Sequence, residues 1–239
     1  MEYVYPLTRA LVKVPLDLGV RWTIEGAQTL PPHGPLLLAT NHTSYLDPFA
    51  VAYLVDKKHR HARFLAKAEL FDKRGLGAYL RAMGQIPVVR NSTAAAGSLE
   101  AAVDDLERGE CVVVFPEGTI SLDLDPAPAR TGIARLAAQT GVPVTPVGMW
   151  GLHRVLFKGR KPDWQWGVAE TIVVGTPVRV ARDENVHDAT DRVMTAIAAC
   201  VARARAIYPQ RPAPGEDDWW FRSPDTARMR PASRQDVAS

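Results

Sequence analysis

An apolar segment at residues 36–40 (LLLAT), followed at once by a polar segment at residues 41–47 (NHTSYLD), constrains the fold most strongly. A short apolar run of this kind predicts a buried strand. The next segment, residues 48–55 (PFAVAYLV), is mostly apolar and predicts a buried helix. His42 is therefore expected in a loop that leads from a strand into a helix.

The polar segment contains a histidine and, five residues later, a carboxylate: His42 and Asp47. Thr43 and Ser44 are expected to cap the following helix, with Asp47 in its first turn. A carboxylate there can accept the proton on one imidazole nitrogen, which leaves the other nitrogen free as a base. A simpler interpretation stays open, because histidine after a strand is often an ordinary loop residue and an early aspartate often only compensates the helix dipole.

Strands and helices are predicted in alternation along the rest of the chain. The predicted strands lie at residues 21–25, 61–66, 86–89, 111–115, 142–147, 171–174 and 177–180, and the predicted helices at 92–108, 130–140 and 185–208. Such alternation predicts a layered α/β fold with a largely parallel sheet flanked by helices, here preceded by an N-terminal amphipathic helix.

We expect the chain to comprise an N-terminal helix at residues 1–20, a central domain at residues 21–208, and an extended or disordered tail at residues 209–239. Pro15 is expected to kink or break the helix, because proline has no N–H to donate. Apolar residues recur on this helix at helical spacing: Leu7, Leu11, Val14 and Leu18. This apolar face could pack on the core or lie in a lipid interface, and the residues alone leave both open.

The composition fits one globular domain, with 239 residues, 46% of them hydrophobic and 23% charged. The net charge of +3 gives no reason to expect nucleic acid as a partner. Between residues 56 and 90, however, nine basic residues stand against three acidic ones, a local balance of +6 (9 − 3). This stretch is either a solvated face or a patch for phosphates of a substrate, a coenzyme or an anionic membrane.

Cysteine and histidine usage favours neither a disulfide nor a metal site. The two cysteines, Cys111 and Cys200, lie far apart in apolar surroundings and are expected to be buried thiols, which suits a reducing, cytosolic compartment. The six histidines show no metal-ligand spacing. We expect no secretory signal at residues 1–20 and, because no apolar run reaches about 18 residues, no transmembrane helix.

Three further motifs follow the His42 segment: residues 84–90 (GQIPVVR), 115–121 (FPEGTIS) and 142–147 (VPVTPV). This order and spacing resemble the lysophosphatidate acyltransferase family, the glycerolipid acyltransferases with a His-x-x-x-x-Asp motif. The resemblance covers roughly residues 36–151. It is specific, because the histidine motif and FPEGT are each uncommon and occur in the family's order.

The resemblance implies an enzyme that moves a fatty acyl group from acyl-CoA or acyl-carrier protein to the free hydroxyl of lysophosphatidate, giving phosphatidate in phospholipid synthesis. Its partners would be the thioester, the lysophospholipid and a membrane surface, and it would need no cofactor. We therefore expect a peripheral location on the cytoplasmic face of a membrane, with residues 1–20 in contact with lipid. The alternatives are acylation of another lysolipid, a glycolipid or an aminolipid, or a non-catalytic lipid-binding module.

The resemblance assigns the general base to His42 and its orientation to Asp47. It places substrate contacts on the loop that contains Glu117, Gly118 and Thr119. Glycine allows a ligand to approach the backbone closely, and the loop amides could serve a phosphate or an oxyanion. Glu117 would either hydrogen-bond a glycerol hydroxyl or orient the loop.

One position departs from the family's pattern. The FPEGT motif is usually followed by arginine and serine, and that arginine is associated with the acceptor's phosphate, but this chain has Ile120. Either the acceptor lacks a phosphate there or other cations hold it. We expect Arg90 to be the main phosphate contact, with Lys67 and Arg130 as further candidates, because guanidinium and ammonium groups bind phosphate through strong charge-assisted bonds.

Several apolar residues outside these motifs have two open interpretations. A helical repeat made of Leu76, Tyr79, Leu80 and Met83 predicts either core or the rim of an acyl groove. Between residues 153 and 166, basic residues are interleaved with Phe157, Trp164 and Trp166, which is typical of an exposed hairpin or of a binding surface for a membrane interface, a coenzyme or a nucleic acid. In the tail, Trp219, Trp220 and Phe221 are expected to dock on the protein or on lipid.

Overall fold

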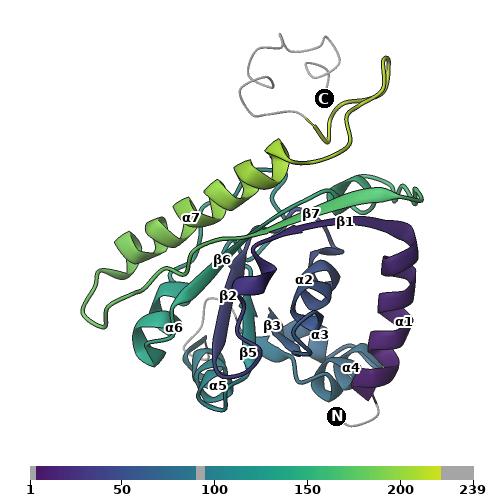
Figure 1. Cartoon of the computed structure of the whole chain (residues 1–239). Coiled ribbons are helices and arrows are strands. Elements are labelled where there is room, and N and C mark those ends of the chain that lie inside the picture. The colour runs from purple at the N-terminus through teal and green to yellow at the C-terminus, as the bar shows by residue number, and fades with distance from the viewer. Residues whose placement is uncertain (1–3, 90–94, 222–239) are drawn as a thin grey trace, which may run out of the picture.

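The computed structural model describes residues 4–89 and 95–221, which form one sheet with helices on both faces (Figure 1). Its strands are β1 (Val20–Glu25), β2 (Leu36–Thr40), β3 (Ala62–Lys67), β4 (Ile86–Val88), β5 (Cys111–Val114), β6 (Val144–Trp150) and β7 (Val168–Val174). The sheet is seven-stranded, in the order β1-β7-β6-β2-β5-β3-β4. Neighbouring strands pair in parallel except for the antiparallel pair β6–β7. The predicted α/β fold with a largely parallel sheet is confirmed.

Helices α5, α6 and α7 cover one face of the sheet, and α2 covers the other. The helices are α1 (Val4–Gly19), α2 (Asp47–Asp56), α3 (Ala68–Phe71), α4 (Leu76–Ala82), α5 (Ala95–Glu107), α6 (Gly132–Thr140) and α7 (Val186–Ala206), with short 3-10 helices η1 (Ala27–Thr29) and η2 (Leu152–Arg154). Leu37 and Ala39 pack towards the first group, and Leu36 and Leu38 pack towards α2. Successive side chains of a strand point to opposite faces, so a strand buried on both faces is mostly apolar.

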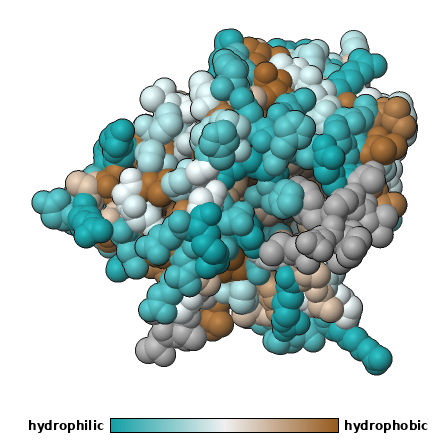
Figure 2. Space-filling view, turned by 60° about the horizontal axis from the view of Figure 1, so that its bottom comes forward, coloured by the Kyte–Doolittle hydropathy of each residue, from teal (hydrophilic) through white to brown (hydrophobic). Residues whose placement is uncertain are grey.

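Helix α1 is continuous through Pro15, so of the two predicted effects, a kink or a break, the break is wrong. Proline removes the hydrogen bond to the Leu11 carbonyl and its ring crowds that carbonyl, but the turn is exposed, so water can bind the carbonyl instead. Leu11, Val14 and Leu18 are 67%, 55% and 64% exposed, so this apolar stripe faces away from the core. Hydrophobic side chains are visible in Figure 2 at the right-hand edge, the side on which Figure 1 draws α1.

The opposite side of α1 contacts the body of the protein. Val12 and Leu16 line a cavity between α1 and the helices α2 and α4. Trp22 donates from its indole nitrogen to the Leu16 carbonyl at 3.1 Å, and Arg9 forms an ion pair with Asp56. Helix α1 therefore presents one apolar side to the cavity and another to the solvent. None of the described helices is long and apolar enough to span a bilayer.

The predicted strand at residues 177–180 is not formed. Val178 instead makes an isolated antiparallel bridge with Val144, in which the two N–H···O distances are 2.7 and 2.9 Å. Pro177 cannot donate to a ladder, so pairing does not extend through it.

The first part of the tail packs on the protein. Trp220 is 2% exposed, and the Arg154 guanidinium lies 3.7 Å from the centre of its ring. The Trp220 carbonyl lies 3.0 Å from Nε2 of the buried His153. This aromatic segment therefore docks on the body of the protein, one of the two expected surfaces.

Replacing Trp220 by alanine should lower the free energy of unfolding by about 3–5 kcal/mol, because the change leaves a cavity under the tail. Trp166→Ala is the matched control, since Trp166 is 78% exposed and its loss should change stability by less than about 0.5 kcal/mol. Urea denaturation of both variants measures the difference. Equal losses would contradict the docking of the tail.

Candidate active site

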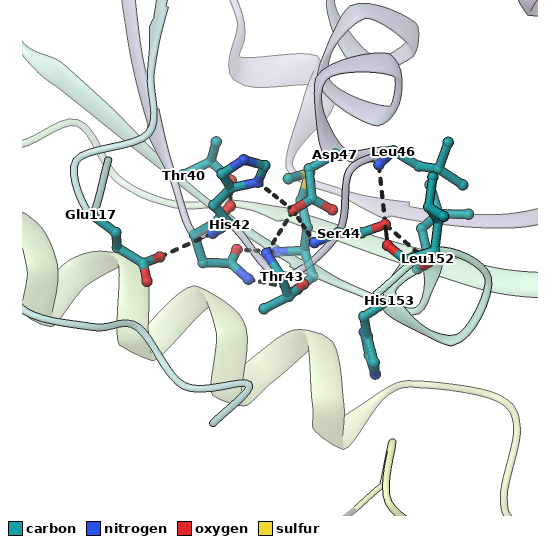
Figure 3. A network of polar contacts seen from close by, with 12 residues as sticks. Thr40, His42, Thr43, Ser44, Leu46, Asp47, Glu117, Leu152 and His153 are labelled. Carbon is teal, nitrogen blue, oxygen red and sulfur yellow. Dashed lines mark hydrogen bonds and ion pairs between the residues drawn. The ribbon is translucent and has the colours of Figure 1, made fainter. Parts of the chain in front are cut away.

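The carboxyl ends of five mutually parallel strands, β4, β3, β5, β2 and β6, meet at one edge of the sheet. Loops at this edge bind ligands in open α/β sheets. The His42 loop follows β2, the Glu117 loop follows β5, and η2 follows β6. Since β2 lies between β5 and β6, these loops are neighbours (Figure 3).

Asn41 fixes the point at which β2 becomes a loop. Its side-chain amide donates to the Met149 carbonyl at 3.0 Å, and its side-chain oxygen accepts from the Met149 N–H at 2.8 Å. The side chain is fully buried. It thus adds one more pair of hydrogen bonds between the end of β2 and β6, and so sets the position of the next residue, His42.

His42 and Asp47 form the predicted pair. Nδ1 of the imidazole lies 2.9 Å from Oδ2 of Asp47 (Figure 3). The same oxygen accepts the N–H groups of Thr43 at 2.6 Å and Ser44 at 2.8 Å. An ionised carboxylate only accepts, so Nδ1 carries the proton and Nε2 has its lone pair free. The imidazole stays partly accessible while Asp47 is buried.

The predicted capping by Thr43 and Ser44 is wrong, because α2 begins after Leu46, which makes no side-chain cap. The Ser44 hydroxyl instead lies 3.1 Å from the Leu152 carbonyl and 2.9 Å from the Leu156 carbonyl. It also accepts the Leu46 N–H at 3.1 Å. Ser44 therefore joins the His42 loop to the segment that follows β6.

Glu117 joins the His42 loop to the loop after β5. Its Oε1 accepts the backbone N–H of His42, and its Oε2 accepts that of Ala127, both at 2.9 Å. Burial raises the pKa of the carboxyl to about 7 from its usual 4.5, and outweighs the two N–H bonds that favour the charged form. Both oxygens are occupied by backbone groups, so the geometry favours loop orientation over a glycerol contact.

The loop between Glu117 and Ser121 follows the backbone of His42. Ser121 donates its N–H to the His42 carbonyl at 2.8 Å. Gly118 has a φ of 69°, a left-handed conformation that suits glycine. Thr119 is exposed, whereas Ile120 is buried. Of these residues, Thr119 is the one that faces outward.

An apolar cavity of about 280 Å³ adjoins this site. Phe115 stacks on the His42 ring with 4.2 Å between ring centres, and Phe64 stacks on Phe115 at 6.1 Å. Phe64 also lines the cavity, as does Phe49 at the start of α2. Three members of the predicted repeat line it too: Tyr79, Leu80 and Met83. The rim interpretation of that repeat therefore fits better than a closed core.

A family model described as Acyltransferase matches residues 21–150, more than half of the 239 residues of the chain. The chain belongs to the acyltransferase family. The predicted family is thereby confirmed, and the matched range contains both the His42–Asp47 pair and the Glu117 loop.

Relatives of this acyltransferase are named 1-acyl-sn-glycerol-3-phosphate acyltransferases. The chloroplastic BAT2 of Brassica napus is 28% identical over 152 residues, which are 63% of this chain and 43% of that protein. The alpha form of Ovis aries is 32% identical over 177 residues, 73% of this chain and 61% of that protein. The chain thus spans less than two thirds of either relative.

The crystal structure of the 1-acyl-sn-glycerophosphate acyltransferase PlsC from Thermotoga maritima shares the fold. Its TM-score is 0.67 at 24% identity, and the match covers 87% of this chain and 81% of that one.

The predicted phosphate-binding cations of the acyltransferase lie at different places. Arg130 donates its backbone N–H to the Pro116 carbonyl at 3.0 Å, so it borders the Glu117 loop, and its side chain is exposed. Lys67 is exposed at the end of β3, which β5 separates from β2, roughly 10 Å away across the sheet. Arg90 lies outside the described residues, so its role stays a prediction.

Sequence patterns missed a buried acid close to the site. Glu170 lies in β7, and its Oε2 accepts the Leu152 N–H at 2.7 Å. Burial, with the charge of Asp47 added, raises the pKa of Glu170 well above its usual range. A lone acid within the apolar strand VAETIVV was the available signal. By holding Leu152, Glu170 supports the carbonyl that Ser44 contacts.

The stability of the wild-type acyltransferase relative to Glu117→Gln should depend on pH. The folded-state pKa of about 7 lies above the usual 4.5, so between these values the folded protein binds more protons than the unfolded one. The stability contributed by this group is fully present below pH 4.5 and is lost as the pH rises to about 7. The loss should reach roughly 3 kcal/mol.

Urea denaturation at several pH values between 4.5 and 7 measures this difference. Glu100→Gln is the control, because Glu100 is an exposed acid on α5 whose replacement should leave the pH dependence of stability unchanged. If the stability of the wild type relative to Glu117→Gln instead increases with pH, the prediction is wrong, because folding would then stabilise the ionised form of Glu117.

Proposed function

We propose that this acyltransferase moves a fatty acyl group from a thioester, acyl-CoA or acyl-carrier protein, to the free hydroxyl of lysophosphatidate, giving phosphatidate. The observation that carries the proposal is the bond between Nδ1 of His42 and Asp47, which leaves Nε2 available as a base. The printed names of the relatives support lysophosphatidate as the acceptor. The same site chemistry would serve another lysolipid, so the acceptor is part of the proposal.

The reaction needs a base because an alcohol hardly ionises at neutral pH. Nε2 of His42 takes the hydroxyl proton while the oxygen attacks the thioester carbonyl carbon. The tetrahedral intermediate then collapses, the carbon–sulfur bond breaks with its electron pair on sulfur, and the imidazolium returns the proton to give the thiol. Asp47 stabilises the imidazolium and holds its orientation. No covalent enzyme intermediate and no cofactor are required.

The cavity beside Phe115 offers a place for the acyl chain. Its lining is almost wholly apolar, and it opens beside Pro48 and Phe49, directly after Asp47 in the sequence. Burying methylene groups in such a cavity contributes about 0.8 kcal/mol each. An acyl chain there would place its carbonyl end towards His42.

We propose that the protein binds peripherally to the cytoplasmic face of a membrane. The outer stripe of α1 exposes Leu11, Val14 and Leu18, although apolar side chains of this size are usually buried. Trp166 extends this surface, because its ring lies beside Gly19 at the end of α1. Exposed tryptophan next to an amphipathic helix is typical of proteins that lie in a lipid interface.

His42→Ala should lower kcat by about two to four orders of magnitude, because it removes the general base. Asp47→Asn should cost less, since it alters orientation and leaves the imidazole in place. Release of thiol from palmitoyl-CoA in the presence of lysophosphatidate measures both. His33→Ala, an exposed histidine, is the control and should retain full activity.

An activity of His42→Ala within about tenfold of the wild type would contradict the mechanism, because a general base contributes more than this. If the wild-type protein releases no thiol with any of a panel of lysolipids, glycolipids and aminolipids, the non-catalytic binding module becomes the better interpretation. Release with another acceptor alone would reassign the substrate and keep the reaction type.

The double variant Leu11→Glu, Leu18→Glu should bind poorly to vesicles of phosphatidylcholine and phosphatidylglycerol, because it places two charges in the apolar stripe. Flotation of the full chain with these vesicles measures binding. The control, Ala198→Glu with Ala199→Glu, adds the same charge at exposed positions of α7, across the sheet from α2. Equal binding of the two double variants would show that the stripe on α1 is not the contact.

A further inference from the structure

Thr119 lies close to the backbone of His42, the residue proposed as the general base. Glu117 on one side bonds the His42 N–H, and Ser121 on the other side bonds the His42 carbonyl. Two residues of chain span at most about 7 Å. Thr119, midway between these two contacts, therefore lies at the rim of the site, and its side chain is exposed.

Lys158 places a positive charge at this rim. Its ammonium nitrogen lies 3.5 Å from the hydroxyl oxygen of Thr119. The side chain is exposed, and no carboxylate of the described residues forms an ion pair with it. A cation of this kind is available to an anionic ligand.

The segment that carries Lys158 is fixed to the His42 loop. The Leu156 carbonyl accepts the Tyr45 N–H at 3.2 Å and lies 2.9 Å from the Ser44 hydroxyl oxygen. Lys158 follows Leu156 by two residues, so the backbone has little freedom to move it away. Two sets of contacts thus place the ammonium group at the rim. One is its own contact with Thr119, and the other is the contact of the Leu156 carbonyl with the turn before Asp47.

We infer that Lys158 contacts the phosphate of the acceptor and supplies there a charge that the buried, apolar Ile120 does not. The inference rests on the proposed function, because lysophosphatidate is the acceptor that carries this phosphate. Glycerol is short, so a hydroxyl placed at His42 leaves the phosphate within a few ångström of the rim. An ammonium group binds phosphate through charge-assisted hydrogen bonds.

Lys158→Ala should raise the KM for lysophosphatidate about tenfold or more, with the KM for palmitoyl-CoA and kcat little changed. Lys158→Arg should restore much of the affinity, because it restores the charge. With monoacylglycerol, which has no phosphate, the wild type and Lys158→Ala should be equally active. Lys161→Ala removes an exposed lysine from the same segment and should behave as the wild type.

The outcomes separate this inference from the proposed function. If the wild type acylates lysophosphatidate and Lys158→Ala keeps the same KM, the inference fails and the proposed function stands. If Arg130→Ala raises that KM while Lys158→Ala does not, Arg130 takes the role instead. If the wild type does not acylate lysophosphatidate at all, both fail. Thermal unfolding of each variant shows whether a loss arises from misfolding, and Lys158→Gln provides a second uncharged variant.

Discussion

The rest of the candidate site depends on the buried carboxylate of Asp47. A buried charge is costly unless it is hydrogen-bonded or paired. Oδ2 meets this requirement by accepting the N–H groups of Thr43 and Ser44 together with Nδ1–H of His42. The first two bonds hold the turn between β2 and α2 in one shape, and the third orients the imidazole against that turn. One oxygen atom, Oδ2 of Asp47, therefore fixes both the backbone conformation of the turn and the orientation of the His42 imidazole.

Around this turn, side chains of one loop bond the backbone of another. Asn41 holds β6, Glu117 holds the His42 N–H, and Ser44 contacts the segment after η2. Each such bond satisfies a polar group that would otherwise be buried without a partner. Because the loops follow adjacent parallel strands, the sheet brings these groups within reach and the bonds then fix their separation. The His42 loop is consequently held by both neighbouring loops, while Thr119 at its edge stays exposed.

The parts of the site that could be predicted are local in sequence. His42 and Asp47 are five residues apart, so the pattern of strand, loop and helix was sufficient to pair them. The contact of Asn41 with Met149 spans 108 residues, and that of Glu117 with His42 spans 75, so they depend on strand order, which periodicity does not specify. The direction of the α1 stripe was open for a related reason: helical spacing defines an apolar face but not what the face contacts. The sheet itself was predictable because strands buried on both faces are mostly apolar.

Ile120 is buried and apolar, so the proposed anionic acceptor would need a cation from another loop. A cation at that buried position would need a partner to offset its desolvation, whereas the side chain of Lys158 reaches the same rim from an exposed segment. That segment is also the one whose Leu156 carbonyl contacts the turn before Asp47. A phosphate bound by Lys158 would therefore contact the same segment that supports the turn between β2 and α2. A phosphate bound at Lys158 would thus be linked, through the Leu156 carbonyl and the Tyr45 N–H, to the turn that holds Asp47 and so to the orientation of the His42 imidazole.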